Sequence, residues 1–588
     1  MPHFDDVLPD LDARFERLRR DRAIPGVAWG VLRDGLLVHA GGAGTARDGE
    51  DRRPDADTVF RIASMTKSFT ATTVLVLRDE GRLRLDDPVA VHVPALRDWR
   101  PLTSDAAPVT IRDLLTMASG LATDDPWGDR QQGLPIDAFE RLLAAGPSLA
   151  RAPGVAFEYS NLGYGILGRV VTAVARAEYR DVVRARLLVP LGMTGSAFEG
   201  DEVAEARLAH GYVRRGDVLV REGEDRYGAL ASMGGLYSSV RDLSKWVAGW
   251  LDAFPARDDP EGPHPLRRSS RREAQQVQRA IPPEVAPHAA DAWPTVTGGG
   301  YGFGLGVVHD PDLGTFVGHA GGYPGFGSFM GWHPATGLGI VALGNRRYAP
   351  MRQPAMEALE ALVRADLVPR RRVVALGAVE RARDAADGLL ALWDDVVADG
   401  LFAMNMDLDE PRELRRAAVE AAVASVGGPL RRDPGRPDVA TSPAELTWWL
   451  RGVRGWLHVS VQVTPEPLPL VQALEVNVVG DPSARLASVA ARVLVLAGDG
   501  ASAWPPDEAA ADGFDGVAAA RSLRAAGARY GTLRLGLPIA GDGVTTATWA
   551  VDGERGKAEL RVSFDGADGP VAGVVLRSPS RAVTDEGW

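Results

Sequence analysis

The 588-residue sequence contains no cysteine. This absence excludes disulfide bonds, thiolate metal sites and a cysteine nucleophile, but it leaves the redox compartment open. No stretch approaches the roughly 18 to 20 uninterrupted apolar residues of a membrane-spanning helix. The first residues also lack a basic segment followed by an apolar run, so no secretory signal peptide is predicted. These absences favour a cytoplasmic protein that has no membrane partner.

The charge balance argues against another class of partner. The formal net charge is −12 and is spread through the sequence, so a nucleic-acid-binding surface is not expected. The ten histidines do not cluster with carboxylates at metal-ligand spacing, and we therefore infer no metal and no cofactor. Hydrophobic residues at 45% and charged residues at 24% are ordinary values for a globular protein. The length favours about two to four domains.

One stretch, residues 60–81, predicts a buried helix that ends at a glycine. Ser64 and Lys67 stand three residues apart, so both side chains are expected on one face of its first turn. A serine becomes a nucleophile when a neighbouring base takes its proton, and a lysine whose pKa is lowered by burial can be that base. Because the Ser-x-x-Lys pattern has only two fixed positions, an ordinary amphipathic helix is the alternative interpretation.

The segments around this helix predict an α/β unit. Early strands, a helical middle and late strands imply one sheet that is built from both ends of the segment. A long surface excursion is expected over residues 253–300, which are rich in Pro, Arg, Asp and Gly. Helices are expected over residues 8–22, 110–120, 160–174, 239–251 and 351–366. Strands are expected over residues 27–31, 36–38, 304–309, 315–318, 326–332 and 339–343.

The composition changes after residue 366, and an internal repeat follows. Residues 447–463 align without gaps on residues 548–564, with an offset of 101 residues. An alanine-rich helical pattern precedes each copy. We therefore predict three domains, which are a first domain over residues 1–366 and two related α+β modules over residues 367–482 and 483–588.

Neither module offers a cluster of residues that would suggest chemistry. Four tryptophans in the predicted strands could line a ligand groove, although aromatic residues in alternating strands more often belong to the core. These are Trp448, Trp449, Trp456 and Trp549. We assign the modules a role in packing, dimerisation or substrate gating.

Two further stretches carry polar residues at the ends of predicted elements. Residues 153–168 place Tyr159 and Asn161 on a loop that begins a helix. Residues 317–326 end a strand with His319, followed by Gly321 and Gly322, which are small enough for a ligand to lie against the backbone.

Together with the Ser64 helix, these stretches resemble the serine β-lactamase and penicillin-binding-protein family. The motifs of this family are Ser-x-x-Lys, Tyr-x-Asn and Lys-Thr-Gly or a His-x-Gly variant. The resemblance is class C-like, covers about residues 10–365, and includes the order and separation of the motifs. It implies a β-lactamase/transpeptidase-like domain, in which an antiparallel sheet is flanked by helices and joined by a helical subdomain.

The resemblance also implies a role for each residue. Ser64 attacks a carbonyl group and becomes acylated, while Lys67 and Tyr159 share the removal and return of its proton. Which of these two is the formal base stays open. Asn161 orients Lys67 or a substrate amide oxygen, and the backbone N–H groups of Ser64 and Gly322 hold the oxyanion.

Each of these residues also has a purely structural interpretation. Tyr159 could be an interface tyrosine at a helix cap, and Asn161 could itself cap the helix. His319 at a strand end could be a structural hydrogen-bonding group.

Substrate choice depends most on His319. In members with Lys-Thr-Gly the lysine helps to hold a substrate carboxylate, whereas a histidine is mostly neutral near pH 7. His-x-Gly members resemble carboxylesterases of β-lactamase fold and D-aminopeptidases more than antibiotic-degrading enzymes. The sequence also shows no identifiable glutamate for activating the deacylating water. Efficient hydrolysis of β-lactams is therefore not expected.

The first functional hypothesis is a serine hydrolase that cleaves small esters or amides through a Ser64 acyl-enzyme. One alternative is a D-stereospecific aminopeptidase or amidase, acting on D-amino-acid-containing substrates, or a weak β-lactamase. An alternative of another class is a catalytically poor sensor that binds penicillin or acyl groups. A homo-oligomer formed through the C-terminal modules is a further hypothesis.

Overall fold

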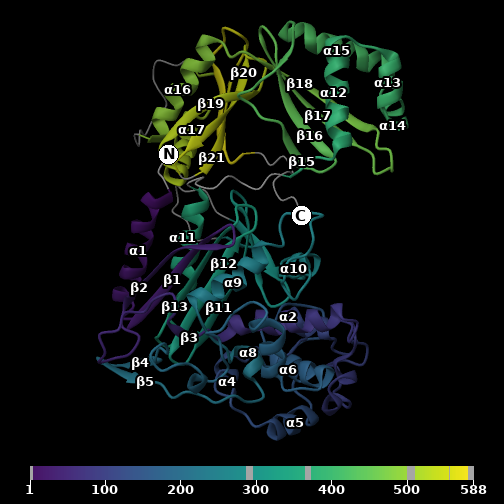
Figure 1. Cartoon of the computed structure of the whole chain (residues 1–588). Helices are drawn as coiled ribbons and strands as arrows, with labels where there is room; N and C mark the ends of the chain where they lie inside the picture. The colour runs from purple at the N-terminus through teal and green to yellow at the C-terminus, as the bar shows by residue number, and fades with distance from the viewer. Residues whose placement is uncertain (1–3, 286–295, 365–372, 499–509, 555, 580–588) are drawn as a thin grey trace. The chain divides into compact units, whose positions relative to one another are not determined.

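The computed structural model describes residues 4–285, 296–364, 373–498, 510–554 and 556–579 (Figure 1). The chain divides into two compact units, and the main boundary between them falls between residues 364 and 373. The first unit contains Ser64 and Lys67 together with the other motif residues.

A nine-stranded sheet forms the centre of the first unit. Its strand order is β2-β1-β13-β12-β11-β10-β9-β7, and β8 pairs with β9. Neighbours along this path run antiparallel. The pair of β1 and β13 joins opposite ends of the segment, with Val31 opposite Ile340, which confirms the prediction of a sheet built from both ends. The strands are β1 (Gly26–Arg33), β2 (Leu36–Gly44), β7 (Arg279–Ala280), β8 (Glu284–Val285), β9 (Val296–Tyr301), β10 (Gly306–Asp310), β11 (Gly314–Tyr323), β12 (Phe326–His333) and β13 (Leu338–Gly344).

Helices cover both faces of this sheet. On one face, α1 (Phe4–Asp21) and α11 (Arg352–Arg364) pack on β1 and β13, where Phe15 stacks on Trp29 with ring centroids 5.0 Å apart. On the other face, α9 (Val240–Leu251) packs on β1, β12 and β13. Strand residues alternate between the two cores, because successive side chains of a strand point to opposite faces. The arrangement is the predicted β-lactamase/transpeptidase-like fold.

A helical subdomain lies between β2 and β9 in the sequence. The excursion expected at 253–300 belongs partly to the core, since Arg271 of α10 is fully buried, and residues 286–295 lie outside the described part. The helices and turns are η1 (Ala63–Met65), α2 (Thr66–Asp79), η2 (Val89–Val91), η3 (Pro94–Leu96), α3 (Ile111–Leu115), α4 (Asp125–Gly128), α5 (Ile136–Ala144), α6 (Asn161–Ala175), α7 (Tyr179–Val183), η4 (Arg184–Leu188), η5 (Gly200–Glu202), α8 (Ala231–Gly234) and α10 (Arg268–Ala274). Two short antiparallel strand pairs accompany them, namely β3 (Val59–Arg61) with β6 (Tyr237–Ser239), which are distant in the sequence, and the hairpin of β4 (Tyr212–Arg215) with β5 (Val218–Arg221).

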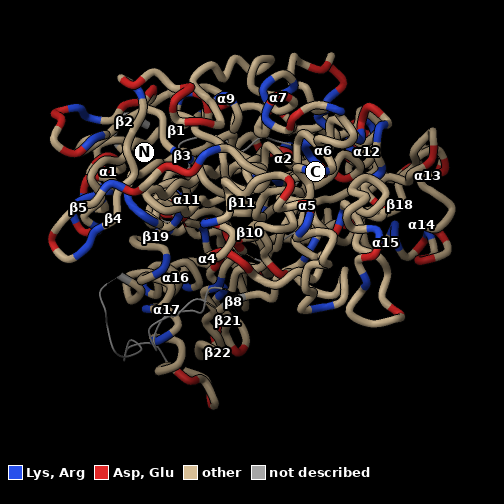
Figure 2. The backbone as a smooth tube through the Cα atoms, turned by 90° about the horizontal axis from the view of Figure 1, so that it is seen from below, with Lys and Arg blue, Asp and Glu red and all other residues tan. Residues whose placement is uncertain are grey.

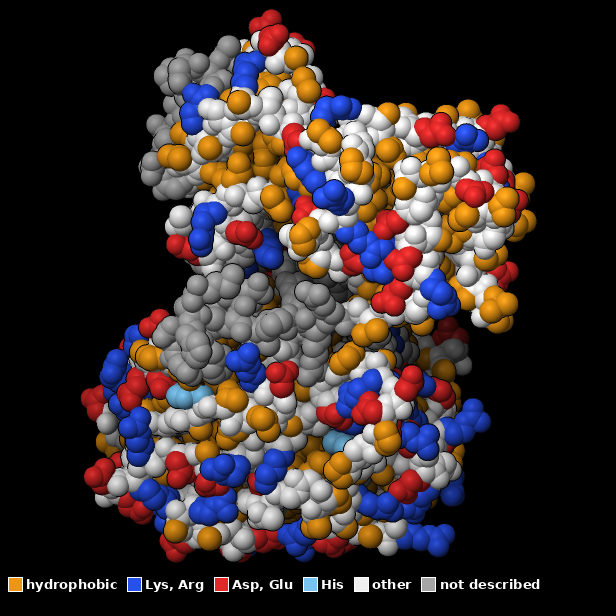
Figure 3. Space-filling view, turned by 45° about the horizontal axis from the view of Figure 1, so that its top comes forward, with side chains coloured by type: hydrophobic (Ala, Val, Ile, Leu, Met, Phe, Trp, Pro, Cys, Tyr) orange, Lys and Arg blue, Asp and Glu red, His pale blue; other side chains and the backbone are white. Residues whose placement is uncertain are grey.

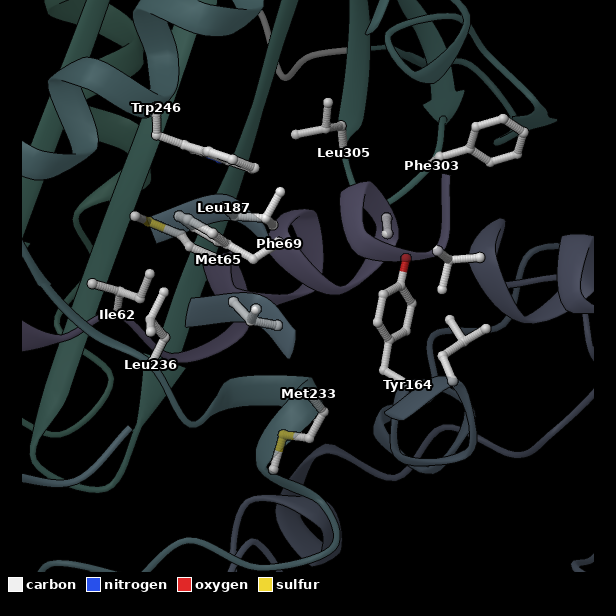
Figure 4. Packing of buried hydrophobic residues seen from close by; sticks show 14 of the residues in the cluster. Ile62, Met65, Phe69, Tyr164, Leu187, Met233, Leu236, Trp246, Phe303 and Leu305 are labelled. Carbon is white, nitrogen blue, oxygen red and sulfur yellow. The ribbon is translucent and has the colours of Figure 1, made fainter. Parts of the chain in front are cut away.

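Helix α2 is buried all round, from Thr66 to Leu77. The ring of Phe69 stacks on Trp246 of α9 with centroids 3.9 Å apart, and Figure 4 shows this pair beside Met65. Most buried hydroxyl groups on α2 have acceptors, as when Thr70 Oγ1 donates to the carbonyl of Ser232 over 2.6 Å, whereas Thr72 Oγ1 has none among the described residues. The helix is therefore held by packing on every side, which keeps the turn before it in a fixed position.

The second unit contains two similar arrangements in succession. In each, two 15-residue helices accompany an antiparallel sheet, and β16 to β20 and β17 to β21 keep the offset of 101 residues at their first residues. The first arrangement consists of α12 (Gly377–Ala391), α13 (Asp395–Leu401), α14 (Met404–Asp409), α15 (Arg412–Val426), β14 (Arg431–Arg432), β15 (Val439–Ser442), β16 (Glu445–Arg451), β17 (Gly455–Val463) and β18 (Val471–Gly480). The second consists of α16 (Ala484–Gly498), α17 (Gly516–Tyr530), β19 (Leu533–Ala540), β20 (Thr546–Gly553), β21 (Gly556–Phe564) and β22 (Val571–Arg577).

The tryptophans of these sheets divide between core and surface. Trp448 and Trp549, which stand at equivalent positions of the repeat, are both buried against their helices. Trp449 and Trp456 are only half-buried, and the Arg436 guanidinium lies 4.1 and 4.5 Å from their ring centroids. Two of the four residues are thus core residues, and the other two form an arginine stack.

Charges of both signs are interspersed along the backbone (Figure 2) and over the face shown in Figure 3. Within the described ranges, no helix combines the length and the apolar character needed to cross a membrane.

We expect Trp246→Ala to lower the free energy of unfolding of the first unit by about 3 to 5 kcal/mol, because it leaves a cavity against Phe69. Urea denaturation followed by circular dichroism measures the change. Trp127→Ala is the matched control, since this tryptophan is 41% exposed. An equal loss of stability in both variants would contradict the assigned packing.

Candidate active site

Ser64 lies in the 3-10 turn η1, which directly precedes α2, whereas the sequence predicts it on the first turn of the helix itself. Ala63 directly before Ser64 has φ 51°, which is uncommon for a residue other than glycine. Hydrogen bonds hold this conformation on both sides. Ser328 Oγ donates to the carbonyl of Ile62 over 2.7 Å, and Thr66 Oγ1 donates to that of Ala63 over 2.7 Å. The strained turn presents Ser64 with 8% of its surface exposed.

Lys67 is completely buried, and its Nζ has three acceptors. It donates to Ser64 Oγ over 3.0 Å, to Asn161 Oδ1 over 2.7 Å and to the carbonyl of Met233 over 2.8 Å. Burial lowers the pKa of Lys67 to about 8, although nearby carboxylates partly oppose that shift. The side chain is therefore poised to exchange a proton near neutral pH.

Three carboxylates of the helical subdomain surround Lys67. Asp125, Asp129 and Asp124 all favour its charged form. Asp124 also accepts from the backbone N–H groups of Asn161 and Leu162 over 2.6 and 2.7 Å, so its carboxylate caps α6. Burial raises the pKa of Asp129 to about 6.

Asn161 does not act as a side-chain cap of its own helix. Asp124 and the Ser160 hydroxyl take that role, the latter by accepting from the N–H of Gly163 over 3.1 Å. The Asn161 amide is instead fixed between two groups, because its Nδ2 donates to Asp125 Oδ1 over 2.8 Å while its Oδ1 accepts from Lys67. The side chain can therefore orient the lysine.

Tyr159 lies beside both Ser64 and Lys67. Its hydroxyl is hydrogen-bonded to the Ser64 side chain, and its ring centroid lies 4.9 Å from Lys67 Nζ. Burial raises the pKa of Tyr159 well above its ordinary value. This hydroxyl is consequently protonated at neutral pH and suits a proton donor better than a resting base.

Strand β11 meets the serine turn at Gly321. A Cβ atom added at Gly321 would lie 2.3 Å from the Ile62 carbonyl oxygen and 2.3 Å from Ser328 Oγ. Only glycine fits there, and its small size lets β11 lie directly against the turn that carries Ser64. The structure thus brings together Ser64, Lys67, Tyr159 and Asn161 with the strand that carries the two glycines.

His319 has a protein partner at each ring nitrogen. Nδ1 lies 2.5 Å from the carbonyl oxygen of Ala320, and Nε2 lies 2.9 Å from Tyr301 Oη. Because a carbonyl only accepts, Nδ1 carries the proton, and Nε2 accepts from Tyr301. Burial lowers the pKa of His319 to about 3, so the ring is neutral. This geometry fits the structural interpretation, and direct substrate binding by His319 stays a prediction.

Sequence reasoning missed several residues of this site. Asp125 begins the short helix α4, Asp124 and Asp129 cap its two ends, and Tyr301 lies at the end of β9. The one available signal was the Asp-Asp pair shortly before the Tyr159 stretch. Within the described residues, no group of three or more His, Cys, Asp or Glu is arranged to hold a metal ion.

Comparison with known proteins shows the family to which the chain belongs. Residues 11–365 match the sequence family described as Beta-lactamase, which is more than half of the chain. The chain belongs to this family. The match begins and ends close to the limits expected from the motifs, and it confirms the resemblance to β-lactamases and penicillin-binding proteins.

Curated relatives include a penicillin-binding protein and a β-lactamase-like protein. Penicillin-binding protein 4 of Amycolatopsis lactamdurans is 30% identical over 342 residues, covering 56% of this chain and 84% of the relative. Protein flp of Staphylococcus aureus (strain COL) is 26% identical over 343 residues, covering 58% of this chain and 64% of the relative. Beta-lactamase-like protein 2 of Dictyostelium discoideum is 27% identical over 271 residues. The aligned part is 43% of this chain and 47% of that relative, so the chain spans about half the Dictyostelium protein's length.

One solved structure is similar over almost the whole chain. It is the octameric penicillin-binding protein homologue from Pyrococcus abyssi, with a TM-score of 0.53 and 19% sequence identity. The similarity covers 97% of this chain and 98% of that one. At this identity the likeness supports the β-lactamase-type fold and the presence of further small-sheet modules.

We expect Gly321→Ala to lower kcat/KM about 100-fold, because the added methyl group displaces β11 from the Ser64 turn. The measurement is steady-state hydrolysis of a p-nitrophenyl ester, together with a melting curve. Gly298→Ala is the matched control in the same sheet, since a Cβ atom there meets nothing within 4 Å. Unchanged activity in Gly321→Ala would contradict the close fit.

Proposed function

We propose that this protein is a serine hydrolase that cleaves small esters or amides through an acyl-enzyme on Ser64. The observation that carries the proposal is the buried Lys67 Nζ, which lies 3.0 Å from Ser64 Oγ and has a pKa of about 8. At pH 7 about one lysine in ten would then be neutral, compared with fewer than one in a thousand for an exposed lysine. The site therefore provides a base at the pH where it is needed.

The choice of lysine supports the same proposal. The chain has three lysines among 66 basic residues, so arginine supplies the positive charge almost everywhere else. Arginine stays charged in proteins, whereas a buried lysine readily loses its proton. A lysine at position 67 therefore fits a group that must exchange a proton rather than one that only carries charge.

The reaction follows from these groups. Neutral Lys67 takes the proton of Ser64, and Ser64 Oγ forms a bond to the carbonyl carbon of the substrate. The oxyanion accepts hydrogen bonds from the backbone N–H groups of Ser64 and Gly322. Tyr159 passes a proton to the leaving alcohol or amine as its bond to carbon breaks, and Lys67 restores the proton of Tyr159. Water then releases the acid from Ser64 by the same steps in reverse order.

A substrate with a free amine is the second candidate. Asp125 and Asp129 lie within electrostatic reach of Lys67, and such carboxylates would favour an ammonium group on a bound amide. This observation supports the aminopeptidase or amidase alternative. Comparison of D- and L-alanine p-nitroanilides with uncharged esters distinguishes the two candidates.

We also propose that residues 367–482 and 483–588 are two domains of common origin, supported by the shared offset of their strands. The similar Pyrococcus abyssi structure is described as octameric. A homo-oligomer formed through the C-terminal modules is thus part of the proposal.

Ser64→Ala is expected to abolish both turnover of p-nitrophenyl acetate and the mass increase of one acyl group per chain, because no acyl-enzyme can form. Mass spectrometry after rapid acid quench measures the adduct. The exposed residue Ser104 provides the control Ser104→Ala, which should retain both properties. Equal activity in the two variants would refute the mechanism. Acylation of the wild-type protein without turnover would favour the acyl-binding sensor.

The pH dependence of kcat/KM is expected to rise and level off with an apparent pKa near 8, because only neutral Lys67 accepts the proton. Asp125→Asn removes a charge that stabilises protonated Lys67, so the midpoint should move to lower pH. Asp86→Asn, at an exposed carboxylate paired with Arg112, is the control and should leave the midpoint in place. A midpoint that moves to higher pH in Asp125→Asn would contradict the assignment.

A further inference from the structure

Tyr348 connects β11 to the helical subdomain across the active site. A Cβ atom added at Gly322 would lie 2.8 Å from Tyr348 Cδ1, so the ring rests on the backbone of the residue proposed to hold the oxyanion. At its other end, Tyr348 Oη donates a 2.8 Å hydrogen bond to Asp129 Oδ2, directly after α4. The Tyr348 side chain therefore contacts both β11, at Gly322, and the helical subdomain, at Asp129.

The backbone of Tyr348 is held in an unusual conformation. Its φ angle is 49°, which is costly for a residue with a large side chain. Its N–H donates to the carbonyls of Tyr323 and Phe326 over 3.3 and 3.1 Å, at the turn between β11 and β12. The surrounding structure thus maintains a strained residue at the edge of the site, which is where such strain has functional meaning.

A second set of contacts reinforces the same position. Glu222 forms ion pairs with Arg347 and, over 3.9 Å, with Arg130. These two arginines are the sequence neighbours of Tyr348 and Asp129. The Asp129 carboxyl is 4% exposed, while Tyr348 keeps 49% of its surface accessible. The Asp129 carboxylate that anchors Tyr348 is thus buried, and the tyrosine ring remains accessible to a ligand.

The orientation of a bound substrate relative to Ser64 follows from the proposed function, on which this inference rests. Tyr159 donates the proton to the leaving group, so the leaving group must lie on its side of Ser64. Tyr159 lies near Tyr301, and Tyr301 is hydrogen-bonded to His319. His319 is the first of the motif residues 319–322 on β11. The acyl substituent must then extend in the opposite direction, past Gly322 and toward Tyr348.

We propose that Tyr348, anchored by Asp129, closes the acyl side of the site and limits the substrate to short acyl groups. Lengthening the acyl chain brings its carbons against the ring that covers Gly322. Discrimination by a single methylene group in such a contact reaches tenfold or more. Tyr348 is in this view a specificity-determining residue, and Asp129 positions it.

The test compares p-nitrophenyl acetate, butyrate and octanoate with the full-length protein, so that the leaving group stays constant. The wild-type protein should prefer acetate or butyrate. Tyr348→Asn removes the ring, and asparagine tolerates positive φ. We expect it to raise the octanoate-to-acetate ratio of kcat/KM about tenfold or more. Tyr348→Phe keeps the ring but loses the bond to Asp129, and should raise the ratio less.

Tyr212→Phe is the matched control, because its hydroxyl contacts the N–H of Asp48 over 2.6 Å, outside the site. Its ratio should equal that of the wild type. An unchanged ratio in a folded Tyr348→Asn protein, or a wild-type preference for octanoate, would overturn the inference. If melting curves show that Tyr348→Asn does not fold, Tyr348→Phe and Asp129→Asn decide, and an unchanged ratio in both overturns it. A wild-type protein inactive on every ester would refute the proposed function, and the inference with it.

Discussion

The buried ammonium group of Lys67 is the interaction on which the site depends. Its three acceptors come from three separate segments, namely Ser64 in η1, Asn161 in α6 and the carbonyl of Met233 in α8. Burial disfavours its charge, while the neighbouring carboxylates favour it. The balance of these opposing effects leaves the pKa near neutrality, and a group so balanced can both accept and return a proton.

The fold serves this balance by keeping its parts rigid. Helix α2 is enclosed on every side, and the glycine at position 321 lets β11 touch the turn that carries the nucleophile. Ala63 stays in a strained conformation because hydrogen bonds from Ser328 and Thr66 surround it. A dense core tolerates little displacement, so serine, lysine and strand remain in register with one another.

The motif residues 319–322 of β11 differ in their surroundings at the two ends. At one end His319 is neutral and occupied by Tyr301 and the Ala320 carbonyl, so the site has no fixed cation where family members with Lys-Thr-Gly have a lysine. At the other end Gly322 is covered by Tyr348. Under the proposed function, a neutral ring at one end and a tyrosine at the other disfavour a large carboxylate-bearing substrate.

The sequence by itself determined the local parts of this protein. The strands expected at 27–31 and 36–38, the Ser64–Lys67 spacing and the repeat offset of 101 residues are visible in it, because residue periodicity, motif spacing and repeats are properties of the sequence alone. Only the tertiary structure decided which groups surround the nucleophile. Asp129 and Tyr348 are 219 residues apart, and neither belongs to a motif. The pKa of Lys67 and the contact of Tyr348 with Gly322 depend on burial and on groups from distant segments. These groups come together only when the chain folds.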